Sequence, residues 1–350
     1  MNLSNTNCQE RPDGITEFRE VCFDLQIVYF ISGWHFYSLA FIAAFDAVLV
    51  IPTTVLNLLV IIAIAKNRTL QTVSNLLLTC LAVCDLLTGM ITQPLIASGT
   101  SFVLNCNSFC WLFVSAFQVG YFLATASFLT LTAVSLDRYI AIFHPFKYQH
   151  LTATKKYICG IATFTWLIPL LMVIVTSAME YIRVQQFFLA ILAPVSVTLS
   201  MIVQVKTVRA VNKARRRDLS LSIRPRDPTA GRTRRRTMNS GKASITALTI
   251  LVATIICYLP QSALTIIRMM GEDKFAFQGI YDWTKTLILM SSTLNPVIYC
   301  LNLTGIRRKI LQMTCPWIHQ HQIDVFPISM TTVNNTSKRT IRKTTLGNVK

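Results

Sequence analysis

The chain has 350 residues, of which 53% are hydrophobic and only 14% are charged. A soluble domain carries about 25% charged residues, so this composition excludes an ordinary soluble protein and indicates a surface that faces lipid. The net charge of +18 does not indicate nucleic-acid binding. The basic residues cluster in segments that follow apolar runs, such as 215–217 and 234–236, as they do in membrane proteins.

Residues 1–36 precede the first apolar run that is long enough to cross a membrane. Their first part is polar and acidic, and the apolar stretch 27–36, which contains Trp34, suits the membrane–water interface. Residues 2–4 form an N-glycosylation sequon with Asn2 as the candidate acceptor. We therefore expect an extracellular N-terminal tail that ends in an interfacial segment.

Seven apolar runs follow, and a helix needs about 20 apolar residues to cross the hydrocarbon. The runs are approximately 37–65, 74–98, 109–142, 158–179, 184–208, 245–269 and 279–301. The sequence therefore predicts an all-α integral membrane protein, a seven-transmembrane helix bundle that occupies residues 37–303.

The connections between the spans differ in charge. Basic residues gather in every second connection and after the last span, whereas the other connections carry few. Because Lys and Arg are retained on the cytoplasmic side, this bias places the N-terminus outside and the C-terminus in the cytoplasm. It predicts a multi-pass protein of the plasma membrane.

Two cytoplasmic segments stand out. The third cytoplasmic loop, about 209–240, is rich in Arg and contains Pro and Gly, so we expect it to be mobile and solvated. Residues 304–313 have an apolar and a basic side, which predicts a short amphipathic eighth helix at the headgroups. Cys315 follows it as a candidate for palmitoylation or as an unmodified thiol. The remainder, 314–350, is predicted to be a disordered cytoplasmic tail.

Asp85 lies inside the second span and has no basic neighbour on its own helix. A carboxylate in the membrane needs a cation, a hydrogen-bond network or a proton. The candidate partners are polar residues within the first, third and seventh spans: Asn57, Ser127, Ser292 and Asn295.

Asp137, Arg138 and Tyr139 close the third span. The guanidinium of Arg138 is always charged. It can pair with Asp137 at rest and reach a partner when released.

Two proline motifs lie in the sixth and seventh spans. Asn295 and Pro296 are followed by Tyr299 in the seventh span, and Tyr258 precedes Pro260 in the sixth. Proline removes a backbone hydrogen bond and bends the helix, so both spans have a built-in bend.

Together these motifs resemble those of the rhodopsin-like (class A) G-protein-coupled receptors, over about residues 37–312. The resemblance implies a sodium and water site around Asp85 and a coupling switch at Arg138. Three positions depart from the family pattern. Tyr258 stands where the family has Trp, Ile202 where Tyr is usual, and Ser240 where many members carry an acidic residue that pairs with the motif Arg. The missing acidic partner predicts raised basal activity.

The cysteines also depart from the family, which links the top of the third span to the second outer loop. That loop contains no Cys here. Cys8, Cys22, Cys106 and Cys110 lie in the oxidising compartment, so at least one bridge is expected between the tail (Cys8 or Cys22) and the region before the third span. The local pairs Cys8 with Cys22 and Cys106 with Cys110 are the alternative.

The chain lacks the residues that bind two of the family's ligand classes. Amine receptors of the family carry an Asp where Gly120 stands, and opsins carry a Lys where Leu289 stands. Asp46 and Lys285 fall at similar depth on neighbouring spans, where either a salt bridge between them or direct ligand contact is possible. The full set of ligand-pocket candidates is Asp46, Gln93, Tyr121, Thr125, Gln261, Thr265, Arg268, Asp282 and Lys285.

The resemblance implies a receptor that converts an extracellular ligand into activation of a heterotrimeric G protein, with arrestin and a receptor kinase as further candidate partners. It implies no enzymatic activity and no cofactor beyond a candidate structural sodium ion. The alternatives are a non-signalling seven-helix scaffold or ligand scavenger, and a transporter. The ligand and the G-protein class stay open.

Overall fold

The computed structural model describes residues 8–314, apart from 11, 13–14, 23–24, 32, 108–109, 153–154, 179–181, 222–227 and 271–277. Asn2, Cys315 and the tail that follows lie outside the described residues. The chain divides into two units, Met1–Ile310 and Leu311–Lys350, and the helical bundle belongs to the first.

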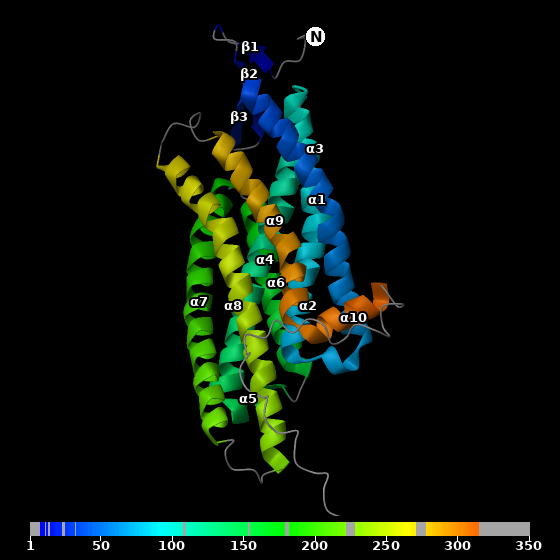
Figure 1. The fold of residues 1–350 in the computed structure, drawn as a ribbon. Coiled ribbons are helices and arrows are strands. Elements are labelled where there is room, and N and C mark those ends of the chain that lie inside the picture. The colour runs from blue at the N-terminus through cyan, green and yellow to red at the C-terminus, as the bar shows by residue number, and fades with distance from the viewer. Residues whose placement is uncertain are drawn as a thin grey trace, which may run out of the picture. The chain divides into compact units, whose positions relative to one another are not determined.

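Long helices form the bundle (Figure 1). Five of them each contain one apolar span: α1 (Gly33–Lys66), α4 (Cys110–Phe143), α6 (Lys155–Ala178), α7 (Ile182–Leu221) and α8 (Pro228–Met269). A sixth span consists of α2 (Val73–Leu87) and α3 (Gln93–Leu104), joined by the π-helical turn η2 (Thr88–Thr92).

The seventh span, α9 (Gln278–Asn302), is apolar enough only when it is counted with the helix that follows. That helix, α10 (Thr304–Thr314), begins after a bend of 103° and is the expected eighth helix. Two short helices, η1 (Arg68–Leu70) and α5 (Pro145–Thr152), lie in connections between spans. The seven-helix architecture expected from the sequence is therefore confirmed.

Side chains are distributed as lipid surroundings require. Val48 and Ile51 on α1 are exposed, whereas Asp46 and Asn57 on the same helix are buried. Only the interior of the bundle offers partners to polar groups, because lipid cannot hydrogen-bond. Apolar residues therefore cover the outside, and most of the polar residues of the spans face inwards.

The core centres on α4, which contacts α2, α3, α6, α7 and α8. Close packing replaces the hydrophobic effect as the force between helices in lipid. The buried residues of this core include Leu81, Phe128, Leu251, Tyr299 and Ile306. Because Ile306 lies near the start of α10, the first residues of α10 also belong to the core.

The third cytoplasmic loop is more helical than expected. α7 continues to Leu221 and α8 begins at Pro228, so helix covers most of 209–240. Arg and Lys are good helix formers, and a helix that continues from a membrane span needs no new nucleus. Pro228 starts α8, where its missing N–H is not needed.

The N-terminal region forms a small antiparallel sheet that the sequence did not predict. Its strands are β1 (Cys8–Glu10), β2 (Thr16–Cys22) and β3 (Leu25–Ile31), in the order β1-β2-β3, with Phe18 opposite Tyr29. The stretch 27–31 was expected to lie at the interface, but its β-branched and aromatic residues favour a strand. The sheet lies beside the end of α3 and the start of α9 (Figure 1).

A disulfide between Cys8 and Cys106 ties this sheet to the segment that follows α3. It confirms the expected bridge between the tail and the region before the third span, and it excludes the local pairing. Cys110 is also disulfide-bonded, whereas the side chain of Cys22 is not among those described. Phe18 of β2 packs against Val103 of α3 beside the bridge. A covalent bond and apolar contacts therefore attach the sheet to the helical bundle.

Replacing both Cys8 and Cys106 by Ser should lower the apparent melting temperature of the purified protein. The bridge joins residues 98 positions apart, and closing a loop of that length contributes at most about 4–5 kcal/mol. Cys159→Ser, which removes an exposed free thiol, should leave the melting temperature unchanged. Non-reducing peptide mapping without a Cys8–Cys106 peptide would contradict this pairing.

Candidate functional site

A cavity of about 240 Å³ opens between the helices, and its lining comes from β3, α1, η2, α3, α4, α7, α8 and α9. Most of the lining residues are apolar or aromatic. Among the described residues, its charged members are Asp46 on α1 and Asp282 and Lys285 on α9. A largely apolar cavity with a few convergent polar groups is the usual form of a small-molecule site.

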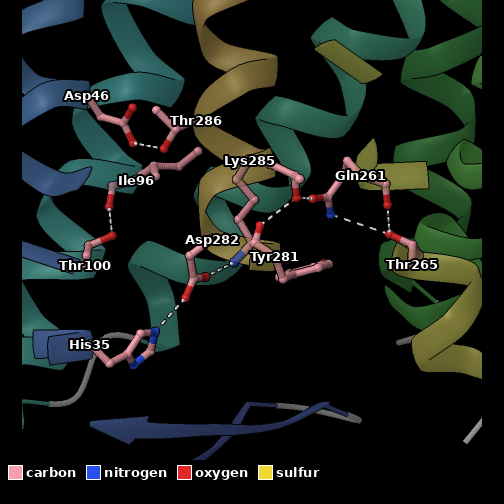
Figure 2. A network of polar contacts seen from close by, with 11 residues as sticks. His35, Asp46, Ile96, Thr100, Gln261, Thr265, Tyr281, Asp282, Lys285 and Thr286 are labelled. Carbon is pink, nitrogen blue, oxygen red and sulfur yellow. Dashed lines mark hydrogen bonds and ion pairs between the residues drawn. The ribbon is translucent and has the colours of Figure 1, made fainter. Parts of the chain in front are cut away.

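Lys285 is held by several partners at the outer part of this cavity (Figure 2). Its Nζ donates to Asp282 Oδ1 at 3.1 Å and lies 4.5 Å from the centre of the Tyr281 ring. His35 Nε2 lies 3.7 Å from the other oxygen of Asp282. Burial raises the pKa of Tyr29 on β3, and the neighbouring Lys285 ammonium opposes that shift.

Asp46 does not form the salt bridge with Lys285 that the sequence left open. Its Oδ2 instead accepts a hydrogen bond from Thr286 at 3.3 Å (Figure 2). Residues three apart on a helix face each other, so Asp282 reaches Lys285 at less conformational cost than Asp46 on a neighbouring helix.

The other pocket candidates divide into two groups. Tyr121 and Gln261 line the cavity, together with Asp46, Asp282 and Lys285. Gln93, Thr125 and Thr265 do not appear in its described lining, and the side chain of Arg268 is outside the described residues.

Gln93, one of the ligand-pocket candidates, contacts neighbouring helices in the structure. Its Nε2 donates to Thr53 Oγ1 at 3.3 Å and to the Leu289 carbonyl at 3.4 Å, so it faces α1 and α9. The π-helical turn η2 immediately before it shifts the helical phase. In the structure, Gln93 therefore faces α1 and α9 and lies outside the described lining of the cavity.

One wall of the cavity is aromatic. Phe113, Phe117 and Tyr121 stack along α4, with ring centres 6.4 and 6.5 Å apart, and all three line the cavity. Tyr121 was expected in the pocket, whereas Phe113 and Phe117 were not, and their spacing of four residues from each other and from Tyr121 is a signal that could have found them. Tyr29 also lines the cavity, and no spacing rule could have found it because it comes from the unexpected sheet.

Below the cavity lies a polar cluster around Asp85. Asn295 Nδ2 donates to Asp85 Oδ2 at 2.8 Å, and Ser292 lies close to the same carboxylate. Asn57 donates to the Ser292 carbonyl at 3.1 Å rather than to Asp85, and Ser127 lies close to Cys84, the residue before Asp85. The five expected residues therefore lie in one region, and among them Asn295 donates a hydrogen bond to the carboxylate.

The end of α4 holds a second charged group. Arg138 Nη2 and Nε donate to Asp137 Oδ2 at 2.6 and 3.1 Å, and Ser74 donates to the same oxygen at 3.0 Å. Asp137 is fully buried. Tyr139 instead stacks on Phe143, with ring centres 4.6 Å apart. Asp137 therefore holds Arg138 in place, and Tyr139 takes no direct part in the pair.

The two proline motifs place aromatic rings inside the bundle. Pro260 lies within α8 and Pro296 within α9. Tyr258 packs edge-on against Phe128 of α4, with ring centres 4.7 Å apart. Tyr299 is fully buried, and its hydroxyl has no hydrogen-bond partner among the described residues. That hydroxyl is free to accept a new partner when the bundle rearranges.

Residues 56–299 match the family model described as 7 transmembrane receptor (rhodopsin family). The chain belongs to this family. Its relatives include the histamine H2 receptor of Cavia porcellus, 24% identical over 78% of this chain and 79% of the relative. The neuromedin-U receptor 2 of Mus musculus is 25% identical over 76% and 74%. The trace amine-associated receptor 365 of Petromyzon marinus is 38% identical over 32% and 30%. These relatives are receptors and not enzymes.

The receptor's cluster around Asp85 has the chemistry that a sodium ion needs. Small hard cations prefer oxygen ligands. Asp85 supplies a buried carboxylate, and Ser292 and Ser127 supply hydroxyl groups. The Oδ1 atom of Asn57 is buried without a partner among the described residues. The residues therefore fit a sodium ion, which would add a positive charge beside a carboxylate that forms no ion pair with a described residue.

Asp85→Asn should remove any stabilisation by sodium. In the wild-type receptor, NaCl should raise the melting temperature above that in N-methylglucamine chloride of equal ionic strength, because the ion binds only the folded state. In Asp85→Asn the two salts should give the same melting temperature. Asp46→Asn, which removes a buried carboxylate elsewhere, should keep the difference. A wild-type receptor indifferent to sodium would refute the ion site.

Proposed function

We propose that this receptor lies in the plasma membrane with its N-terminus outside, binds an extracellular ligand in the cavity and activates a heterotrimeric G protein. The distribution of basic residues supports the orientation, since Lys66, Lys147 and Arg307 lie at the end of the bundle that carries α10. The sheet and the cavity then face outwards, and Arg138 faces the cytoplasm.

One observation carries the proposal: Ser292 belongs both to the cavity lining and to the cluster around Asp85. Tyr258, which lies two residues before the bend-forming Pro260, also lines the cavity. A ligand in the cavity therefore meets Ser292 of the polar cluster and Tyr258, which precedes Pro260 of α8 by two residues. It shifts the receptor only by its different affinity for the two states.

In the proposed active state, α8 swings about Pro260 and Arg138 leaves Asp137. The resting pair is short and buried on the carboxylate side, so release requires a new partner for the guanidinium. The G protein supplies it in this proposal. Arrestin and a receptor kinase are proposed as later partners, because the tail beyond residue 314 contains Ser and Thr acceptors.

The names of the relatives do not settle the ligand. Receptors for histamine, trace amines and neuromedin U are all among them. Gly120 stands where the amine receptors of the family carry an Asp, so their usual amine contact is absent from this chain.

Arg138→Ala should abolish nucleotide exchange in membranes that contain the receptor and a panel of G proteins of different classes. The always-charged guanidinium is the group proposed to reach the G protein. Lys147→Ala removes an exposed basic residue from the neighbouring α5 and should leave exchange within about twofold of wild type. Wild-type exchange in Arg138→Ala at equal surface expression would refute coupling through this residue, and a wild type without exchange would favour a scaffold.

Ser240→Glu should lower ligand-free exchange. Between Asp227 and the end of α8 the sequence contains no carboxylate, so Asp137 is the acidic residue that holds Arg138 at rest. An added exposed ion pair contributes about 0–1 kcal/mol, and 1 kcal/mol corresponds to roughly a fivefold change in an equilibrium. The expected fall is therefore up to about fivefold, with Ser240→Gln as the uncharged control. Equal basal exchange in Ser240→Glu and wild type would show that the missing carboxylate has no effect.

A further inference from the structure

Asp46 is a buried carboxylate that faces the cavity with part of its bonding capacity unused. The residue is 1% exposed and lines the cavity. Its Oδ2 accepts the hydrogen bond from Thr286, but Oδ1 is buried and has no partner among the described residues (Figure 2). A buried carboxylate without a cation is unfavourable, so a bound cation would be stabilised there.

Lys285 does not supply that cation. Its ammonium is bound by Asp282, lies over the Tyr281 ring and is close to Tyr29. It acts on Asp46 only at longer range and forms no ion pair with it. When both carboxylates are ionised, the described charged lining carries one net negative charge, which favours a ligand with one positive charge.

The wall of the cavity formed by α4 suits the rest of such a ligand. Phe113, Phe117 and Tyr121 form a continuous aromatic surface, and Leu39 and Ile42 of α1 add aliphatic side chains to the lining. Aromatic faces bind apolar groups and also attract ammonium ions. The cavity thus joins one free carboxylate to an extended apolar surface.

Gly120 of α4 contributes no side chain to the cavity. It lines the cavity, and a Cβ atom added to it would lie 3.3 Å from Thr92 Cγ2 of η2, a tight contact. Asp46, on the neighbouring α1, presents its oxygen to the same cavity from another side.

We propose that the receptor binds a small lipophilic monoamine, with its ammonium group at Asp46 and its apolar part on Phe117 and Tyr121. The proposal rests on the proposed function of the cavity as a ligand site and names the ligand's chemical class. The cavity volume of about 240 Å³ lies below the usual range for drug-sized ligands, which favours a small molecule.

The first test measures the unfolding temperature of the purified full-length receptor with three monoamines: 2-phenylethylamine, 2-cyclohexylethylamine and 3-methylbutylamine. At least one should raise it in a saturable way. 2-Phenylethanol and 3-phenylpropanoate have a similar size but carry no charge or a negative charge. They should bind at least about 30-fold more weakly than the matched amine, because a buried charge pair would be lost. Equal binding of amine and alcohol, preference for the anion, or no effect of any amine would overturn the proposal.

The second test locates the contact. Asp46→Asn should weaken binding of the amine at least about 30-fold. Cys159→Ser changes an exposed residue outside the described lining of the cavity and should stay within a few-fold of wild type. Lys285→Met should retain amine binding, since the ammonium repels a cation. If Asp46→Asn does not fold, Asp46→Glu should still prefer the amine to the alcohol. Unchanged amine binding in Asp46→Asn would refute the assignment.

The unfolding measurement needs no G protein, which separates this proposal from the proposed function. Amine binding that depends on Asp46 but never alters nucleotide exchange would refute the signalling role and leave the binding site intact. Exchange that depends on Arg138, in a receptor that binds none of the amines, would refute the amine site and leave the signalling role intact.

Discussion

Carboxylates inside a bundle that faces lipid need partners from the neighbouring helices, because lipid offers no hydrogen bonds. Three aspartates of the spans meet this constraint in different ways. Asp137 pairs with the adjacent Arg138, Asp85 is held by Asn295 of α9, and Asp46 has one hydrogen bond from Thr286. The three carboxylates differ in their partners and in their proposed roles. Asp137 belongs to the proposed switch, Asp85 to the candidate ion site and Asp46 to the candidate ligand contact.

The cavity, the polar cluster around Asp85 and the core of the bundle share residues or lie in contact. The cavity reaches Ser292, which hydrogen-bonds within the cluster around Asp85, and Tyr258 touches both the cavity and Phe128 in the core. Packed interiors respond to a small change by moving between discrete arrangements. The contacts of Tyr258 therefore join the cavity lining on α8 to the core residue Phe128 of α4.

The N-terminal sheet contributes to the site as well as to stability. The disulfide at Cys106 and the packing of Phe18 hold the sheet beside α3. Tyr29 of β3 lines the cavity close to Lys285. The N-terminal sheet therefore supplies part of the surface that a ligand in the cavity would meet.

The seven spans, the eighth helix and the pairing of Asp137 with Arg138 could be predicted from the amino-acid sequence. These features depend on apolar length, on helical periodicity and on residues adjacent in the chain, all of which can be read locally. Three features became visible only in the packed bundle: Lys285 binds Asp282 and not Asp46, Gln93 faces α1 and α9, and β1, β2 and β3 form a sheet. Each of these outcomes is a competition between partners from different segments, and their distances are fixed only when the whole bundle packs.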